Sequence, residues 1–319
     1  MLIVKKGYFI ALVFIIAVFA TEAMAKSKIG ILIWSEESRY AEANRGFMEQ
    51  LKNDGFAEAQ VDFTIENAKG NKVKASELAQ KFASRGMDMV VAIGASAAIA
   101  VAKEIKDVPV ILNFVYDPVD AKIAQSWQSS GNNTTGTTPK YPVSKLVSYL
   151  KQLAPVNKLA VLYTSGEKNS EAQLKEFLAI QADSQITIVP VDLSRKEEVS
   201  LTIPDVCQRV DAIYFSGSNI VSQTAAEIVD IAAKAKVITV THLDDLVTKG
   251  VLLGVYADPL LVGKLAGKKA VKILKGAKPS SIPIESMKDL EVVINMKTAR
   301  ASRIDVPSAF LKTATKVIE

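Results

Sequence analysis

Residues that usually carry out chemistry are scarce in this chain. Its 319 residues include one histidine, His242, and one cysteine, Cys207, which excludes a Ser-His-Asp triad, a multi-histidine metal site, a cysteine-based zinc site and an internal disulfide. No Gly-rich phosphate loop follows any apolar run. Glu36-Glu37 and Asp244-Asp245 could form a carboxylate metal site, but acidic pairs near helix starts more often complement the helix dipole. We therefore expect no catalytic residue, metal or cofactor, and a protein that is not an enzyme.

Polar segments that follow apolar runs are the places where a ligand would bind. They carry hydroxyl, amide or carboxylate groups, whereas the runs before them are nearly all apolar. In open parallel sheets, ligands bind outside the carboxyl ends of the strands, where loops lead into helix N-termini. The predicted ligand-binding residues are Trp34, Glu36, Ser96, Asp117, Glu167, Asn169, Ser170, Ser218, Asn219, His242 and Asp244.

Several of these residues also have simpler explanations. Ser96, Ser170 and Asn219 would each suit a helix N-cap, a role that is compatible with ligand contact because a capped helix end can still offer N–H groups. Trp34 ends an apolar run, where it forms either a wall of the cleft or part of the core. His242 points either to the ligand or to solvent.

Alternating apolar runs and amphipathic segments must position these loops. From Lys28 onward, short β-branched runs alternate with longer segments of 3.6-residue periodicity, which predicts parallel sheets with helices on both faces. The predicted strands are 29–34, 61–66, 89–94, 110–115, 158–163, 185–190, 212–215, 237–241, 282–286 and 290–295. The predicted helices are 41–54, 73–85, 97–106, 144–153, 170–182, 196–210, 220–235 and 259–275.

The second half of the chain repeats the pattern of the first, which predicts two lobes of one architecture. The chain is longer than a single hydrophobic core usually serves. Residues 129–139 contain no apolar side chain and predict a surface crossing between the lobes. We expect the first lobe to comprise residues 26–136 and 257–284, and the second residues 137–256 and 285–319, with three crossings.

The first 25 residues predict export. Lys5 and Lys6 precede an apolar run from Tyr8 to Ala20, which is too short to span a bilayer, and Ala23 and Ala25 suit a signal-peptidase site. We expect cleavage after Ala25 and a periplasmic protein. The net charge of +5 is mild and its basic residues are scattered, so no nucleic-acid partner is expected.

A series of short motifs runs through the whole mature chain in a fixed order. They are Ile29-Gly-Ile-Leu, Asn44-Arg-Gly-Phe-Met-Glu-Gln-Leu, Ala92-Ile-Gly-Ala-Ser-Ala-Ala, Val110-Ile-Leu-Asn-Phe-Val-Tyr-Asp-Pro-Val, Gly131-Asn-Asn-Thr-Thr-Gly, Val161-Leu-Tyr, Asp211-Ala-Ile-Tyr, Gly263-Lys-Leu-Ala-Gly, Ile273-Leu-Lys-Gly and Leu290-Glu-Val-Val-Ile-Asn. Each is weak alone. In this order they resemble the substrate-binding proteins of ABC importers, in the type I periplasmic binding protein family that includes tryptophan- and tyrosine-type receptors.

The resemblance implies an α/β fold of two Rossmann-like lobes joined by three hinge crossings, with a small organic ligand enclosed between them. The ligand would be amino-acid-like or another small polar or aromatic metabolite, and a monomeric protein would deliver it to an ABC permease in the inner membrane. The alternative is a periplasmic sensor whose closed form docks on a membrane signalling receptor. A secreted hydrolase is a weaker rival, because no motif places a base.

The chain departs from this family at two loops. Many relatives have an acidic-His-Pro turn after the first strand, where this chain has Glu36-Glu37-Ser38. Relatives often have a Ser-Asp pair where this chain has Thr241-His242. An aspartate in the second place would suit an amino group, so the resemblance extends to the general function more than to the substrate.

Overall fold

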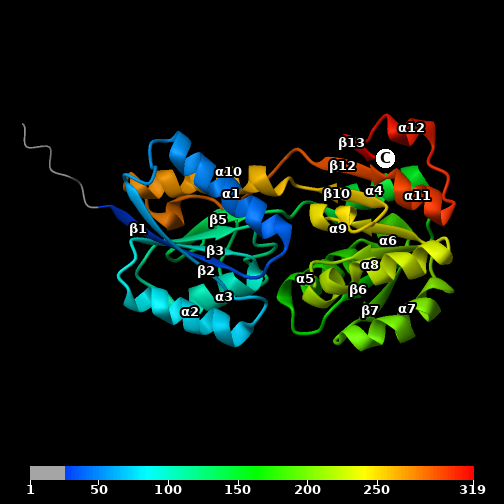
Figure 1. The fold of residues 1–319 in the computed structure, drawn as a ribbon, viewed down its shortest axis with the longest axis horizontal. Coiled ribbons are helices and arrows are strands. Elements are labelled where there is room, and N and C mark those ends of the chain that lie inside the picture. Colours follow the sequence, from blue (N-terminus) through cyan, green and yellow to red (C-terminus); the bar gives the residue numbers. More distant parts are fainter. Residues whose placement is uncertain (1–25) are drawn as a thin grey trace, which may run out of the picture.

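The computed structural model describes residues 26–319 and folds into two α/β lobes side by side (Figure 1). The predicted signal peptide, residues 1–25, lies outside the described residues. Within residues 26–319, no helix is both long and apolar enough to cross a membrane.

The first lobe is built on a six-stranded sheet whose strands are all parallel. Its strand order is β11-β5-β4-β3-β1-β2. Helices α1 and α10 cover one face and α2 and α3 cover the other (Figure 1). The elements are β1 (Ser27–Ile33), α1 (Ser38–Asn53), β2 (Val61–Asn67), α2 (Lys72–Ser84), β3 (Met89–Ile93), α3 (Ala95–Glu104), β4 (Val110–Asn113), β5 (Thr134–Thr138), α10 (Pro259–Leu274), η2 (Pro279–Ser281) and β11 (Glu285–Ser286).

The second lobe is built on a seven-stranded sheet in the order β13-β12-β10-β9-β8-β6-β7. Its strands are parallel except for the antiparallel β10–β12 pair. The elements are α4 (Val143–Leu153), β6 (Lys158–Tyr163), α5 (Lys168–Ala179), α6 (Gln181–Ser184), β7 (Thr187–Asp192), η1 (Lys196–Glu198), α7 (Val199–Cys207), β8 (Ala212–Phe215), α8 (Asn219–Lys234), β9 (Ile238–Thr241), α9 (Asp244–Thr248), β10 (Leu253–Tyr256), β12 (Glu291–Asn295), α11 (Met296–Ser302), α12 (Ser308–Leu311) and β13 (Lys316–Ile318).

The chain passes between the two sheets three times, at residues 139–142, 257–258 and 287–290. These links join β5 to α4, β10 to α10, and β11 to β12. The predicted α/β class, with two parallel-sheet lobes, is confirmed.

The prediction that residues 129–139 form a surface crossing is wrong, because Thr134–Thr138 form the buried strand β5. Two of the buried hydroxyls are satisfied by tertiary hydrogen bonds: Thr135 donates to the Ile282 carbonyl at 2.7 Å and Thr138 to the Tyr116 carbonyl at 2.6 Å. Gly136 lies so close to β4 that a Cβ there would sit 2.0 Å from the Leu112 carbonyl oxygen. A strand that buries hydroxyls carries no apolar signal in its sequence.

Other differences concern short elements. The predicted helix 196–210 is the 3-10 turn η1 followed by α7, which ends at Cys207, and β7 starts two residues later than predicted, at Thr187. The strand predicted over 282–286 is confined to Glu285–Ser286. Besides β5, the elements that the sequence did not predict are η2, β10, β13, α9, α11 and α12.

Candidate ligand-binding site

A narrow pocket between the lobes, here called the inner pocket, is lined from both sides. Its volume is about 20 Å³, which is about the room that one water molecule needs, so the two lobes are closed on each other. The lining is largely aromatic and amide in character. It consists of Arg39, Tyr40, Ala95, Phe114, Tyr116, Pro139, Asn169, Gln173, Gly217, His242 and Leu243.

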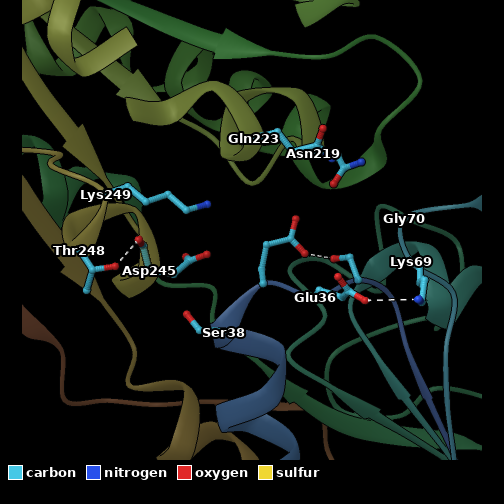
Figure 2. A pocket seen from close by; sticks show the side chains of 11 residues that line it. Glu36, Ser38, Lys69, Gly70, Asn219, Gln223, Asp245, Thr248 and Lys249 are labelled. Atoms are coloured by element: carbon cyan, nitrogen blue, oxygen red, sulfur yellow. Dashed lines mark hydrogen bonds and ion pairs between the residues drawn. The ribbon is translucent and has the colours of Figure 1, made fainter. Parts of the chain in front are cut away.

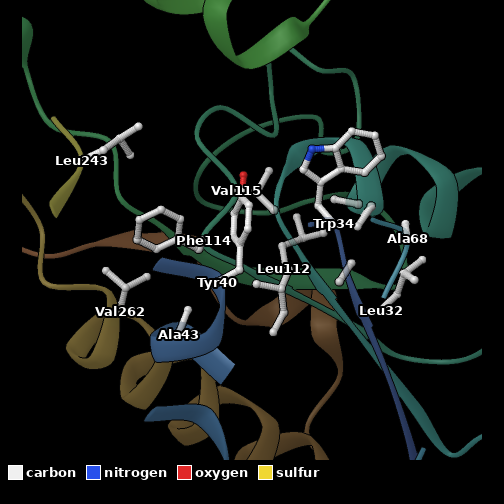
Figure 3. Packing of buried hydrophobic residues seen from close by; sticks show 14 of the residues in the cluster. Leu32, Trp34, Tyr40, Ala43, Ala68, Leu112, Phe114, Val115, Leu243 and Val262 are labelled. Atoms are coloured by element: carbon white, nitrogen blue, oxygen red, sulfur yellow. The ribbon is translucent and has the colours of Figure 1, made fainter. Parts of the chain in front are cut away.

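Aromatic rings from the first lobe form one wall of the inner pocket. Tyr40 and Phe114 pack edge to face, with ring centroids 6.2 Å apart, and Figure 3 shows them beside Leu243 of the second lobe. Phe114 follows β4 with φ at 57°, a conformation that is strained for a bulky residue and that tends to occur at binding sites. The backbone after β4 therefore holds this ring at the cleft.

The opposite wall is fixed by hydrogen bonds to His242. This side chain is 4% exposed, and its Nε2 lies 3.1 Å from Gln173 Nε2 while its Nδ1 lies 2.5 Å from the Tyr214 hydroxyl. The ring of Tyr116, from the first lobe, meets it edge-on at 5.4 Å. Burial, together with the charge of Arg39, lowers the pKa of His242 to about 3, so the ring is neutral near pH 7.

A buried ion pair joins the lobes next to the inner pocket. Arg39 on α1 is 2% exposed, and its Nη1 lies 2.6 Å from Oδ2 of Asp245 on α9, which is 3% exposed. Its Nη2 lies 3.4 Å from the Ser222 hydroxyl and 3.8 Å from Glu37 Oε1. Burial, and then the charge of Asp245, raise the pKa of the neighbouring Asp244 to about 7.

A larger polar cavity of about 470 Å³, here called the mouth cavity, lies on the other side of this ion pair (Figure 2). The first lobe contributes the loop after β1 and the turn after β2, and the second contributes α8 and α9. The lining residues are Ser35, Glu36, Glu37, Ser38, Lys69, Gly70, Asn219, Gln223, Asp245, Thr248 and Lys249.

Charged and polar groups also join the lobes near the first crossing. The Tyr116 hydroxyl, from the first lobe, donates to Oε2 of Glu176 on α5 at 2.9 Å. Lys140, in the crossing itself, pairs with Glu176 at 2.6 Å and also with Asp117. Burial, as the largest effect, raises the pKa of Glu176. Tyr116, Lys140 and Glu176 are here called the hinge cluster.

Six of the predicted residues lie at or beside these cavities. Asn169 and His242 line the inner pocket, and Glu36 and Asn219 line the mouth cavity. Glu167 accepts from the Asn219 backbone N–H at 2.8 Å, which places it beside the mouth cavity. Asp244 directly precedes Asp245 at the start of α9.

The other five predicted residues line neither cavity. Trp34 belongs to the core of the first lobe and is 7% exposed. Ser96 is half-buried in the first turn of α3, whose N-cap is Gly94 rather than Ser96. Asp117 is engaged by its own turn and by Lys140, whereas the hydroxyls of Ser170 and Ser218 brace buried loops around Thr164.

Ser218, and not Asn219, caps α8 by accepting from the Val221 N–H. The N-cap of α5 is Glu167 rather than Ser170. The alternative explanation of Ser96, Ser170 and Asn219 as helix N-caps is therefore wrong for all three residues.

Most residues that line the inner pocket are not among the predicted ligand-binding residues. Arg39 and Tyr40 lie in the first turn of α1 and Gln173 in the second turn of α5, beyond the polar loops that follow the strands. A usable signal was present, because Gln173 follows Asn169 by one helical turn and so shares its face. The pairing of Arg39 with Asp245 joins residues 206 positions apart, which no local pattern reveals.

Comparisons with known proteins agree with this architecture. A family model described as ABC transporter substrate binding protein matches residues 28–318. A tyrosine-binding protein from Clostridioides difficile is 26% identical over 283 residues, which cover 88% of this chain and 82% of that protein.

Two solved structures are similar along nearly the whole chain. The ABC domain in complex with L-Trp from Streptococcus pneumoniae is 29% identical with a TM-score of 0.87, and the match covers 92% of this chain and 100% of that one. The ligand-free, open structure of a substrate binding protein with adhesive properties from Clostridium difficile is 27% identical with a TM-score of 0.74. That match covers 92% of this chain and 99% of the other. At similar identity, this chain superposes better on the Trp-bound structure than on the open one.

Proposed function

This chain belongs to the family of ABC transporter substrate binding proteins, and on that premise we propose that it traps a small aromatic, amino-acid-like solute between its lobes and delivers it to an ABC permease. The inner pocket is the observation that carries the proposal. Tyr40, Phe114 and Tyr116 face it from the first lobe, and Asn169, Gln173 and His242 face it from the second. Rings supply apolar contact and amides supply orientation, as small-molecule sites require.

Trapping follows from the division of these contacts between two lobes. A ligand shifts the equilibrium between open and closed forms only by its preference for the closed form, and that preference requires contacts on both sides at once. We propose that the lobes divide at the three crossings, residues 139–142, 257–258 and 287–290, a few residues beyond two of the expected boundaries, and that they rotate about them. Closure removes the solute from water, and opening at the permease releases it.

Similar proteins indicate the chemical class of the solute. One relative is a tyrosine-binding protein and one similar structure holds L-Trp. An aromatic ring fits the aromatic wall of the inner pocket, where stacked or edge-on contacts contribute about 0.5–1.5 kcal/mol beyond burial.

Delivery to an inner-membrane permease requires export, so we also propose processing after Ala25 and action in the periplasm. Intact-mass measurement of the periplasmic protein should find Lys26 at the N-terminus. A periplasmic protein that still begins at Met1 would contradict the cleavage. Uptake of labelled solute into cells should require both this protein and the permease.

The binding proposal is tested by identifying the solute that co-purifies, using mass spectrometry after mild denaturation. The expected molecule has one or two fused aromatic rings and a nitrogen substituent. Replacing Phe114 with Leu removes a ring and keeps an apolar side chain, so the affinity measured by calorimetry should fall roughly three- to tenfold. Leu178→Ala, on the exposed part of α5, is the control and should bind like wild type. Equal affinity of the Phe114→Leu and wild-type proteins would mean that the aromatic ring of the solute does not contact Phe114.

A further inference from the structure

Two side-chain amides of the second lobe face the inner pocket in fixed orientations. Asn169 and Gln173 lie one helical turn apart on α5, and both line the inner pocket. Asn169 Nδ2 donates to the Gly217 carbonyl at 2.5 Å, and Gln173 Oε1 accepts from the Gly217 N–H at 2.9 Å. Because a carbonyl only accepts and an N–H only donates, each amide can make its bond in one orientation only. No hydrogen bond from the described residues reaches Asn169 Oδ1, which is left as an acceptor.

The ring of His242 fixes Gln173 from the other side. Its Nε2 lies 3.1 Å from Gln173 Nε2, and because an amide nitrogen only donates, the histidine Nε2 must accept. The neutral ring then carries its proton on Nδ1, which donates to the Tyr214 hydroxyl at 2.5 Å. The Tyr214 hydroxyl donates in turn toward Gln173 Oε1, 3.5 Å away. The second N–H of Gln173, a side chain that is 1% exposed, has no partner among the described residues and is left for a ligand.

The glycine at position 217 keeps the two amides accessible. The φ angle of Gly217 is not positive, so the backbone does not require glycine there. A Cβ at this position would lie 2.9 Å from Asn169 Nδ2 and 3.5 Å from Gln173 Nε2. Any side chain would therefore displace or cover the wall that the two amides form.

This amide wall offers one donor and one acceptor but no charge. Arg39 is the cation that lines the inner pocket, and its closest contact is Asp245. No carboxylate of the described residues lines the inner pocket. A carboxylate of the solute would therefore find one N–H and no free cation at the amides, and an ammonium group would find one acceptor and no counter-charge. A hydroxyl both donates and accepts, so one hydroxyl satisfies both amides at once.

We propose that Asn169 and Gln173 bind a ring hydroxyl of the trapped solute, so that its substrate class is phenols. His242 and Tyr214 are positioning residues, because they act through Gln173. The inference rests on the proposed function, since the ring has to lie between the amide wall and the aromatic wall of the first lobe. All four residues belong to the second lobe, so their arrangement does not depend on how far the lobes close. The solute meets the amides when the lobes open, and closure brings the aromatic wall to its ring.

Calorimetry with two matched pairs of probes tests the phenol site. The pairs are tyrosine with phenylalanine and tyramine with phenethylamine, and the members of each pair differ by one hydroxyl. We expect the hydroxylated member to bind roughly tenfold tighter or more, because a plain phenyl ring leaves both amides unpaired when the lobes close. Equal affinity within any pair that binds would overturn the phenol site and leave the proposed function standing. Failure of all four molecules to bind would reject the proposed function together with the phenol site.

A substitution separates the amide from the rest of the pocket. Gln173→Met keeps a side chain of similar length but removes the donor, so the preference for tyrosine over phenylalanine should fall to about threefold or less. Gln152→Met, the same change at an exposed position of α4, should keep the full preference. The ratio of two affinities in one protein is not altered by a loss of stability. A preference that survives in the Gln173→Met protein would count against the site.

The protonation of His242 provides a test that requires no ligand. This residue is the only histidine of the chain, so ¹⁵N NMR of the histidine ring at pH 7.5 reports on this side chain alone. We expect the proton on Nδ1. A proton on Nε2 would mean that the ring donates to Gln173, which would then present an oxygen instead of an N–H, and the positioning role would be overturned.

Discussion

At the scale of single residues, His242 links the closed structure to acid stability. Burial beside Arg39 lowers its pKa from 6.5 to about 3. Between these values the unfolded chain binds a proton that the folded chain does not bind. His242 therefore contributes stability that is fully present above pH 6.5 and is lost as the pH falls toward 3.

Replacing His242 with Gln should flatten the acid side of the stability profile. Glutamine can still bond to Tyr214 and Gln173 but does not titrate. Wild type should lose roughly 1.4 kcal/mol per pH unit through this residue between about pH 6 and pH 4. The free energy of unfolding in urea, measured at pH 7.5 and at pH 5.0, should drop about 2 kcal/mol more in wild type than in the variant. Identical drops would mean that the ring has the same pKa in the folded and unfolded states.

Wild type must be compared with the His242→Gln variant because the stability that Asp244 contributes depends on pH in the opposite direction. Its pKa is raised to about 7, so its contribution to stability is present below pH 3.8 and is lost as the pH rises through 7. The two residues partly offset each other in wild type. The difference between wild type and His242→Gln isolates the histidine.

At the scale of elements, α1 and α10 pack closely against each other in the first lobe. A Cβ on Gly46 would lie 2.0 Å from the Leu260 carbonyl oxygen, and one on Gly263 would lie 2.0 Å from the Ala43 carbonyl oxygen. Both obstacles are backbone atoms, so the helices must move apart to admit a methyl group. α1 also carries Arg39 and Tyr40 to the cleft, so this contact positions the site.

Gly46→Ala should therefore destabilise the protein by about 2–3 kcal/mol in urea unfolding, the cost typical of overpacking. Gly276→Ala is the control: its φ of 96° also disfavours a side chain, but no atom lies within 4 Å of the added Cβ. That substitution should cost only about 1 kcal/mol. Equal costs would show that the helices part freely.

The hinge cluster provides a second prediction at this scale. Tyr116→Phe keeps the ring at the inner pocket but removes the hydrogen bond to Glu176, so affinity for the solute should fall about five- to tenfold. Lys175 on the same helix pairs with Asp120 of the first lobe at 2.8 Å, but it is 76% exposed. Because exposed ion pairs contribute little, Lys175→Ala should change the calorimetric affinity less than twofold. Similar losses for both variants would refute the role given to the hydroxyl.

The sequence predicts elements well wherever hydrophobic periodicity carries the signal. Most strands and helices fall within a few residues of the predicted ranges, because their buried positions are apolar. Strand β5 was missed because its buried side chains are threonines, of which Thr135 and Thr138 are satisfied by tertiary hydrogen bonds that leave no apolar signal in the sequence. At the candidate site, the positions of Asn169 and His242 follow from topology, because each comes a few residues after the carboxyl end of a strand. The pairing of Arg39 with Asp245 joins different lobes and has no local signal in the sequence.

At the scale of the whole molecule, the closed structure requires an open partner state. The inner pocket of about 20 Å³ cannot admit an aromatic solute while the lobes touch. The lobes approach closely at Gly70, where a Cβ would lie 3.1 Å from Nδ2 of Asn219 on the other lobe. Lys72 also donates to the Gly166 carbonyl across the cleft at 3.1 Å. The mouth cavity is thus bounded by a contact that must open for entry and re-form for trapping.

Blocking that contact should uncouple binding from closure. We expect the radius of gyration of wild type, measured by small-angle X-ray scattering, to fall when the solute is added, because closure brings the lobes together. In Gly70→Leu the added side chain meets Asn219, so the radius should stay at its ligand-free value and the affinity should fall at least tenfold. Gly55→Leu carries a similar backbone penalty at φ 89° but has nothing within 4 Å, and it should contract like wild type. Contraction of the Gly70→Leu protein on adding solute would show that the lobes trap their ligand without re-forming this contact.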